Sequence, residues 1–325
     1  MPKRFSTKNL TVIAEPTPIA DGVGIFEFTD DYSVFHYSKM PDRIPGKGEA
    51  ICRMAVFNFR LLEAAGIRTH FRQFHPPNRI EFTLLRVRDP QVDPIEPGSR
   101  GHLVPLQVIF RNTLAPNNSL RRRHAAGRVD LAELGLDALP PDGVPLAEPL
   151  VEFTTKLEEI DRFVTRQEAR TLAGLDEAGL AEVGGLAVRV DEVITAHARG
   201  IGLDHADGKI ECGIAADGGL LLVDNAGTPD ENRLMWHGQH VGKQILRDYY
   251  LVRGLEERVQ RWAADGVSRT HWDTPERLPV GFVSTMSTVY RALCQEWTGE
   301  RVWDVPPLDE ALKTARLLNT EAVTW

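Results

Sequence analysis

Charged side chains alternate along one segment of the chain. Asp207, Lys209 and Glu211 occupy every second position of "ADGKIECG", and Asp224 ends the apolar run "GLLLVD". A period of two places the first three side chains on one face of a β-strand. The segment therefore predicts a strand with two acids and a lysine on one side, followed by an apolar strand that ends on a further acid.

The turn between these strands sets their register. "AADGG" contains Asp217-Gly218, a strong signal for a two-residue hairpin turn. Such a turn pairs Ala216 with Gly219 and places Glu211 opposite Asp224. Carboxylates facing each other across strands, about 4.5–5.5 Å apart, repel. Mg²⁺, which proteins hold with one or two carboxylates and substrate phosphates, would remove that repulsion. The alternative is a hydrated polar face, and a one-residue slip in register removes the facing pair.

A second group of residues has the chemistry of a phosphate site. "VIFRNTLAPNNSLRRR" places Arg111 at the end of an apolar strand and Ser119 in a turn before three arginines. Backbone N–H groups of a turn, a hydroxyl and a guanidinium are suitable donors for a phosphate monoester. A capped loop that leads into a hydrated basic helix explains the same residues.

Three further motifs carry charges with the same ambiguity. Lys47 in "IPGKGEA" stands at a predicted helix start, where free N–H groups favour an anion, although a simple turn and cap is an equal explanation. Lys156 in "EFTTKLEEIDR" and Arg233 in "TPDENR" fit a ligand site or an ordinary charged helix and turn. No Ser-His-Asp, Cys-His or zinc pattern is present, so the inventory favours phosphate and magnesium chemistry.

Alternating and apolar runs predict the strands and helices that carry these residues. Strands are expected in "LTVIAE", "GVGIFEFTD", "THFRQF", "RIEFTLLRVR" and "LVPLQVIFRN", and helices in residues 49–66, 165–200 and 238–264. Thr165 and Glu168 fit a capping box at the start of the second helical region. This order predicts an α+β protein built on mainly antiparallel sheets, with a partly helical tail.

Composition limits the class of protein. The 325 residues carry a formal charge of −8 and a pI of about 5.7, which disfavours nucleic acid as a partner. No apolar run has the length of a membrane span, and three scattered cysteines predict reduced thiols in the cytoplasm. Lysine occurs at only eight positions, so it is either reserved for sites that need a compact point charge or scarce through codon usage.

The motifs together resemble the SAICAR synthetase (phosphoribosylaminoimidazole-succinocarboxamide synthase) family. "IPGKGEA", "VIFRN", "EFTTKLEEIDR", "ADGKIE", "LLLVDNAGTPDENRL" and "KQILRDYY" occur in the family's order, and "DDYSVF" is similar to its archaeal-type branch. The resemblance implies a two-part, ATP-grasp-related α+β fold with antiparallel sheets and a C-terminal helical extension. It suggests a β-rich nucleotide-binding part at residues 1–103, an α+β part at 104–254 and the extension at 255–325.

The resemblance also implies a reaction and a set of site residues. ATP phosphorylates an azole ribonucleotide carboxylate, and the amine of an amino acid such as L-aspartate forms an amide. The implied roles are Mg²⁺ binding by Glu211 and Asp224, nucleotide binding by Lys8, Lys156 and Lys209, and substrate binding by Arg111, Ser119, Arg233, Lys47, Asp161 and Asp207.

Three residues depart from the family pattern near the expected cleft and are candidate specificity residues. His36 and Lys39 stand where relatives tend to carry acids, and Asn225 stands where many have glutamate. These departures leave two alternatives to the purine-pathway reaction. One is a paralogue acting on a C-nucleoside-type azole carboxylate in nucleoside antibiotic biosynthesis, and the other is a nucleotide-binding regulator without catalysis. Small molecules are the expected partners in each case, and homo-oligomerisation stays open.

Overall fold

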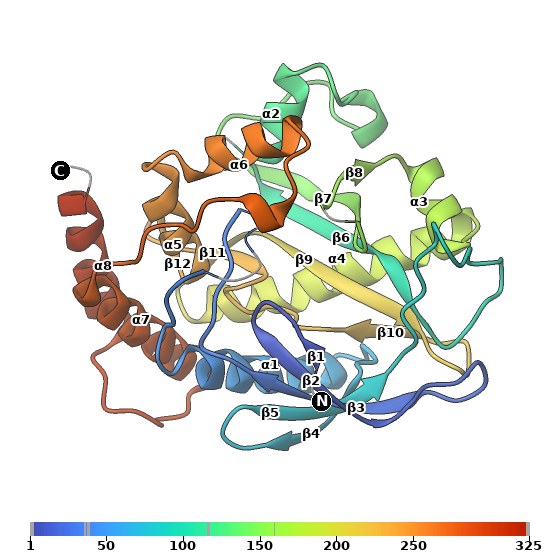
Figure 1. The fold of residues 1–325 in the computed structure, drawn as a ribbon, viewed down its shortest axis with the longest axis horizontal. Helices are drawn as coiled ribbons and strands as arrows, with labels where there is room; N and C mark the ends of the chain where they lie inside the picture. Colours follow the sequence, from blue (N-terminus) through green and yellow to red (C-terminus); the bar gives the residue numbers. More distant parts are fainter. Residues whose placement is uncertain (1–2, 36, 38–39, 116–117, 159, 323–325) are drawn as a thin grey trace.

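Two antiparallel sheets form the frame of the molecule (Figure 1). The computed structural model describes residues 3–35, 37, 40–115, 118–158 and 160–322. The first sheet has five strands in the order β1-β2-β3-β5-β4. Its strands are β1 (Lys3–Arg4), β2 (Lys8–Ala14), β3 (Gly22–Phe28), β4 (Phe71–His75) and β5 (Arg79–Leu84). The strands expected in this part of the sequence are confirmed.

The second sheet carries most of the charged motifs. It has seven strands in the order β12-β11-β9-β6-β7-β8, with β10 also paired to β9. They are β6 (His102–Thr113), β7 (Pro145–Thr155), β8 (Phe163–Val164), β9 (Asp204–Ile214), β10 (Leu220–Val223), β11 (Asn232–Trp236) and β12 (Gln239–Val241). Strand β6 pairs with both β7 and β9, so the phosphate motif and the alternating charges lie on adjacent strands.

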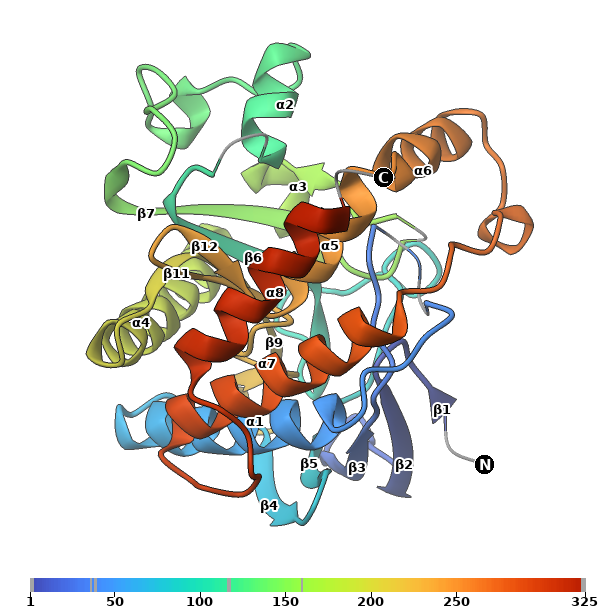
Figure 2. The same ribbon diagram turned by 90° about the vertical axis from the view of Figure 1, so that its left-hand side faces the viewer.

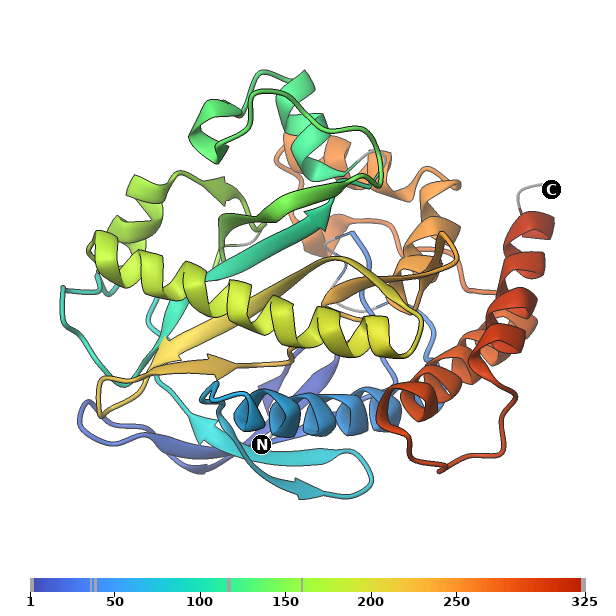
Figure 3. The same ribbon diagram turned by 180° about the vertical axis from the view of Figure 1, so that it is seen from behind.

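Long helices cover these sheets. Helix α4 crosses the second sheet on the side seen in Figure 3, and α1 runs along the first. The helices are α1 (Lys47–Ala64), α2 (Ser119–Ala125), α3 (Arg166–Ala173), α4 (Glu177–Gly200), α5 (Lys243–Leu251), α6 (Leu255–Ala264), α7 (Val280–Thr298) and α8 (Leu308–Ala322), with short 3₁₀ turns η1 (Ala132–Leu134) and η2 (Arg269–His271). Because α4 takes the apolar face of the sheet, the charged face of β9 is left for the site.

The C-terminal helices complete the core. Figure 2 shows α7 lying along α1, with α8 packed on α7. Their buried side chains belong to the same apolar cluster as those of α1 and α4. The residues beyond 254 therefore fold onto the body of the protein, although the division at residues 103 and 254 itself remains a prediction.

The expected register of the β9–β10 hairpin is wrong by one residue. Glu211 lies opposite Val223, and Asp224 follows the end of the strand. The cause is the turn: the Gly218 amide bonds to the Ala215 carbonyl, and Gly218 has φ +89°, so the loop holds three residues instead of two. The two acids still lie close enough to interact, since Asp224 raises the pKa of Glu211, and the backbone of Asp224 has φ +61°.

Two expected helical regions are interrupted. Residues 165–200 form α3 and α4, which are separated where Gly174 adopts φ +61° and Asp176 caps α4. The predicted cap is present, since Thr165 accepts a hydrogen bond from the Glu168 amide. Residues 238–264 begin with β12 before α5 and α6.

The structure also describes the cysteines and the apolar character of the helices. Cys52, Cys212 and Cys294 are free and buried. Within the part of the chain that the structure describes, no helix combines the length and the apolar character needed to cross a membrane.

Candidate active site

Lysine–carboxylate pairs join the first sheet to the second and connect segments within the second. The ammonium groups of Lys8 and Lys156 contact Asp224 and Glu211, and Lys209 lies 3.1 Å from Glu231. Lys8 comes from β2 of the first sheet, whereas Lys156 follows β7 and Lys209 lies on β9 of the second. Two of the three lysines predicted to bind nucleotide therefore contact the two acids predicted to bind magnesium, and the third, Lys209, lies near enough for both acids to raise its pKa.

The electrostatics of the two acids fit a divalent cation. Burial raises the pKa of Glu211, and Asp224 adds to this while Lys156 opposes it. Burial would also raise the pKa of Asp224, but Lys8 and Lys156 hold it well below its usual range. The two carboxylates thus interact with each other and with the surrounding lysines. Among the described residues no group of three or more His, Cys, Asp or Glu forms a metal cage, so phosphate oxygens and water would complete a magnesium shell.

Asp224 is held by His70, a residue that the sequence did not indicate as part of the site. The buried His70 donates from Nε2 to the Asp224 carbonyl at 3.2 Å. Burial lowers the pKa of His70 to about 4, so the ring is neutral at pH 7. The amide of His70 also bonds to the Leu222 carbonyl, which links the segment before β4 to β10. His70 therefore fixes the backbone that carries the acid.

The residues predicted to hold a phosphate also come together. Arg111 on β6 donates to Ser119 at 2.9 Å and to Glu152 on β7 at 3.0 Å. Arg233 on β11 donates to Asp207 on β9 at 2.5 Å, and Arg111 lies 3.6 Å from the same carboxylate. These contacts follow from register, since Arg111 and Arg233 both pair with Asp207 across neighbouring strands.

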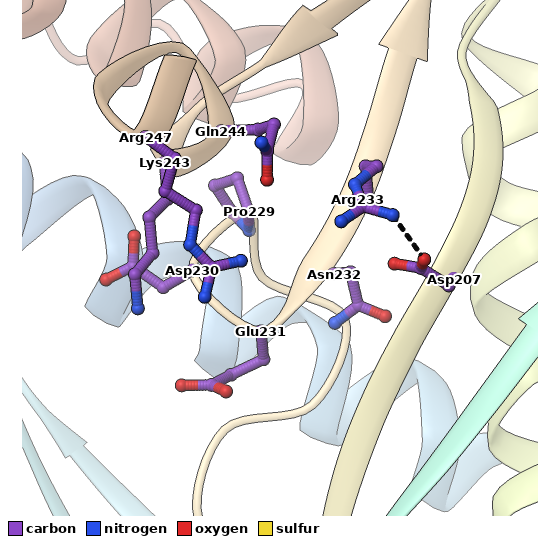
Figure 4. A pocket seen from close by; sticks show the side chains of 9 residues that line it. All are labelled: Asp207, Pro229, Asp230, Glu231, Asn232, Arg233, Lys243, Gln244 and Arg247. Atoms are coloured by element: carbon purple, nitrogen blue, oxygen red, sulfur yellow. Dashed lines mark hydrogen bonds and ion pairs between the residues drawn. The ribbon is translucent and has the colours of Figure 1, made fainter. Parts of the chain in front are cut away.

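A pocket opens beside this arginine group (Figure 4). Its lining residues are Asp207, Pro229, Asp230, Glu231, Asn232, Arg233, Lys243, Gln244 and Arg247. In Figure 4, Lys243 and Arg247 extend from α5 toward Asp230 and Glu231, opposite the Arg233–Asp207 pair. The pocket thus combines three cationic side chains with three carboxylates.

Lys243, Arg247 and Glu231 were not expected as site residues. Burial and, to a smaller extent, the positive charge of Arg247 lower the pKa of Lys243, while Asp230 and Glu231 raise it, and together these effects give a pKa of about 8. The sequence did hold a signal, because Lys243 follows a glycine at a helix start in a chain with eight lysines. Its neighbours in space, however, come from a loop that precedes it by twelve or more residues.

The remaining predicted residues lie at the edge of this site or outside the described residues. Lys47 contacts Asp230 at 2.5 Å. Burial raises the pKa of Asp161, although the charges of Lys209 and Lys156 nearby oppose this rise. Asn225 is buried next to Asp224, and its Oδ1 has no hydrogen-bond partner among the described residues. His36 and Lys39 fall outside the described residues.

Two antiparallel sheets with paired lysines and carboxylates between them define an α+β protein equipped to handle phosphate groups. Comparison with known proteins gives the family. The sequence model of SAICAR synthetase matches residues 19–262. The chain is 36% identical to an Archaeoglobus fulgidus protein that bears the phosphoribosylaminoimidazole-succinocarboxamide synthase name, over 94% of this chain and 97% of that one. The Thermoplasma acidophilum synthase is 32% identical over 85% and 93%.

Solved structures agree with the fold. A SAICAR synthetase in complex with ADP superposes with a TM-score of 0.61 at 25% identity, covering 85% of this chain and all of the other. The Saccharomyces cerevisiae synthase complexed with SAICAR gives 0.65 at 20% identity, over 93% and 95%. The chain belongs to the SAICAR synthetase family, whose members are ATP-dependent carboxylate–amine ligases.

Proposed function

We propose that this protein couples the carboxylate of carboxyaminoimidazole ribonucleotide (CAIR) to the amine of L-aspartate with Mg²⁺-ATP, a step of purine biosynthesis in the cytoplasm. One observation supports this most directly: lysine–carboxylate pairs suited to nucleotide phosphates adjoin an arginine group suited to a ribonucleotide phosphate. The relatives named above carry the purine-pathway name, so the nucleoside-antibiotic alternative has no support from them and is not proposed.

The lysines would bind the phosphates of ATP. Among the described residues, Lys8, Lys156 and Lys209 each contact a single carboxylate, and an ammonium group on a flexible stem can exchange one oxygen partner for another. Glu211 and Asp224 would hold Mg²⁺, which supplies charge neutralisation on the phosphoryl group when bound. The nearby lysines spread the remaining negative charge of that group.

The arginine group would anchor the other substrate. Arg111, Arg233 and Ser119 offer donors to the ribonucleotide phosphate, and Asp207 keeps both guanidinium groups in place. Lys243 and Arg247 add positive charge in the adjoining pocket, where they would receive a carboxylate of a substrate. The azole carboxylate would then lie between the anchored phosphate and the ATP.

Every bond change in this reaction can be accounted for without a protein nucleophile. A carboxylate oxygen of CAIR attacks the γ-phosphorus of ATP, which forms an acyl phosphate and releases ADP. The neutral amine of aspartate then attacks the acyl carbon, the amide bond forms, inorganic phosphate leaves, and the amine gives up a proton. Such a reaction depends on orientation and charge stabilisation. The described residues supply lysine and arginine side chains and carboxylates for both orientation and charge stabilisation.

Product identification tests the proposal. Purified protein with Mg²⁺-ATP, CAIR and L-aspartate should release ADP and form SAICAR, as measured by coupled ADP detection and product mass. Reactions that omit aspartate, or replace it with glutamate, serve as controls. Binding of Mg²⁺-ATP without ADP release in any of these mixtures would show a nucleotide-binding regulator and overturn the ligase assignment.

A further inference from the structure

Helix α7 packs against the turn that carries Lys47. It lies beyond residues 19–262, the span matched by the family's sequence model. Ser287, Tyr290 and Arg291, spaced i, i+3 and i+4, share one face of the helix. Ser287 donates to the Pro45 carbonyl at 2.5 Å. The face of α7 that meets this turn is therefore polar and specific.

The turn is shaped to accept the helix. Gly46, the N-cap of α1, has φ +80°, and a Cβ at this position would lie 2.4 Å from the Arg291 side chain. A larger residue would force the flexible end of the Arg291 side chain to move, and it would strain the left-handed backbone at this position. The glycine before Lys47 thus suits the backbone of the turn and leaves room for the Arg291 guanidinium of the C-terminal helix.

Tyr290 connects this helix to the pocket. Its hydroxyl donates to Asp230 Oδ1 at 3.0 Å, while Lys47 contacts Oδ2 of the same carboxylate at 2.5 Å. The Tyr290 ring also lies 5.5 Å from the Lys47 ammonium. Tyr290 is fully buried, and the side chains of Lys47 and Asp230 are only 1% and 5% exposed. Both oxygens of Asp230 are therefore held from outside the loop that carries it.

Asp230 stands at the start of a segment that serves both parts of the site. The next residue, Glu231, pairs with Lys209, and Arg233 pairs with Asp207. The amides of Glu231 and Asn232 donate to the Thr228 carbonyl at 3.0 and 2.9 Å, which closes a tight turn around Asp230. A shift of Asp230 would consequently move Glu231 and Arg233 with it.

A second contact supports the same loop. Trp297, two turns after Tyr290 on α7, donates to Asn58 of α1 at 2.7 Å. Asn58 in turn donates to the Ala226 carbonyl at 2.8 Å. Helix α7 therefore reaches the loop between β10 and β11 at two separated points, directly through Tyr290 and indirectly through Asn58.

We infer that Tyr290 is a positioning residue of the ligase: it holds Asp230 together with Lys47, so that helix α7 sets the geometry of the substrate pocket. This inference rests on the proposed function for its kinetic consequence. The Tyr290 hydroxyl touches Asp230 and no reacting atom, so it acts through the segment 230–233.

The test compares Tyr290→Phe with Tyr250→Phe. Both remove one hydroxyl from a buried tyrosine, and Tyr250 donates at 2.9 Å to the Glu276 carbonyl of the same C-terminal extension without lining the pocket. Tyr290→Phe should lower kcat/KM for CAIR about tenfold, the effect of losing one hydrogen bond to a charged group, with KM for ATP changed less than twofold. Tyr250→Phe should leave both values near wild type.

Amide hydrogen exchange gives a readout that needs no turnover. Exchange in segment 228–233 should speed up in Tyr290→Phe and stay unchanged in Tyr250→Phe, with Asp230→Asn loosening the same segment from the loop side. If the wild type makes no SAICAR, the proposed function fails, and exchange together with calorimetric CAIR binding still decides the role of Tyr290. Equal kinetics and equal exchange in the two tyrosine variants would overturn the inference.

Discussion

The two ends of the site use different basic side chains, lysine at one end and arginine at the other. At the lysine end, defined by Lys8, Lys156 and Lys209 with their carboxylates, each ammonium contacts one acid within the described part of the chain. At the arginine end, Arg111 contacts Glu152, Ser119 and Asp207, and Arg233 shares the last of these. The lysine end consists of single ion pairs, whereas the arginine end is a connected network.

This difference corresponds to two tasks. A network of guanidinium hydrogen bonds holds its donors in fixed directions, which suits an anchored phosphate. Single lysine–carboxylate pairs can open, so that the acids turn to a metal and the ammonium groups to the phosphates that are transferred. Of the six lysines with described side chains, five lie in the site and Lys313 pairs with Asp309 on α8.

The largest effect is expected from Glu211→Gln at the lysine end. The amide keeps the shape of the side chain but removes one of the two charges offered to Mg²⁺. We expect ADP release to fall about 10³-fold, the upper range for loss of one electrostatic contact in a transition state. Steady-state ADP release, with circular dichroism to confirm an intact fold, measures this.

Glu300→Gln is the matched control for this change. Glu300 pairs with Arg53 at 3.1 Å, and its side chain, just beyond the C-terminal end of α7, is 54% exposed. It should retain wild-type activity. Full activity of Glu211→Gln would show that β9 does not carry the metal site, and the lysine end would then lose its assigned task.

A smaller effect is expected from Arg233→Lys at the arginine end. Lysine keeps the charge but has no planar fork to bond Asp207 and a phosphate together. KM for CAIR should rise about thirtyfold while KM for ATP stays within twofold, as initial rates with each substrate varied would show. Arg68→Lys is the control, because Arg68 pairs with Asp217 on the exposed hairpin turn. An equal rise in both KM values would erase the distinction between the two ends.

Much of this architecture was readable in the sequence. Strand alternation predicted that Asp207, Lys209 and Glu211 share a face, and β9 pairs with β6 so that Arg111 lies opposite Asp207. The helix cap at Thr165 was likewise local, and its N-cap hydrogen bond from the Glu168 amide is confirmed. These features depend on residues close in sequence or on motifs in family order, and both can be recognised from the sequence alone.

The errors and omissions come from long-range geometry. The register of β10 depended on whether Gly218 closes a two-residue or a three-residue loop, and the sequence is compatible with both loops. His70, Lys243 and Tyr290 act on residues 154, 13 and 60 positions away, and no local pattern marks such pairs. Burial also determines the pKa values of His70 and Lys243, and burial of a given polar residue follows from tertiary packing.

The smallest expected effect is a pH dependence of kcat/KM that arises from Lys243, which belongs neither to the lysine end nor to the arginine end. Burial lowers the pKa of Lys243 to about 8, so its ammonium is charged at pH 7 and mostly neutral at pH 9. If the charged form receives a substrate carboxylate, kcat/KM for CAIR falls as pH rises through 8, by at most about tenfold between pH 7 and pH 9.

Lys243→Arg tests this directly, because a guanidinium remains charged throughout that range. Its activity at pH 7 should lie within about threefold of wild type, and the alkaline decline should disappear. The ratio of kcat/KM in the variant and the wild type, taken at each pH with saturating ATP and aspartate, cancels the titration of the aspartate amine. Lys313→Arg on the surface of α8 should reproduce the wild-type profile. A decline that persists in Lys243→Arg would assign it to another group and leave the pocket cation without a part in binding.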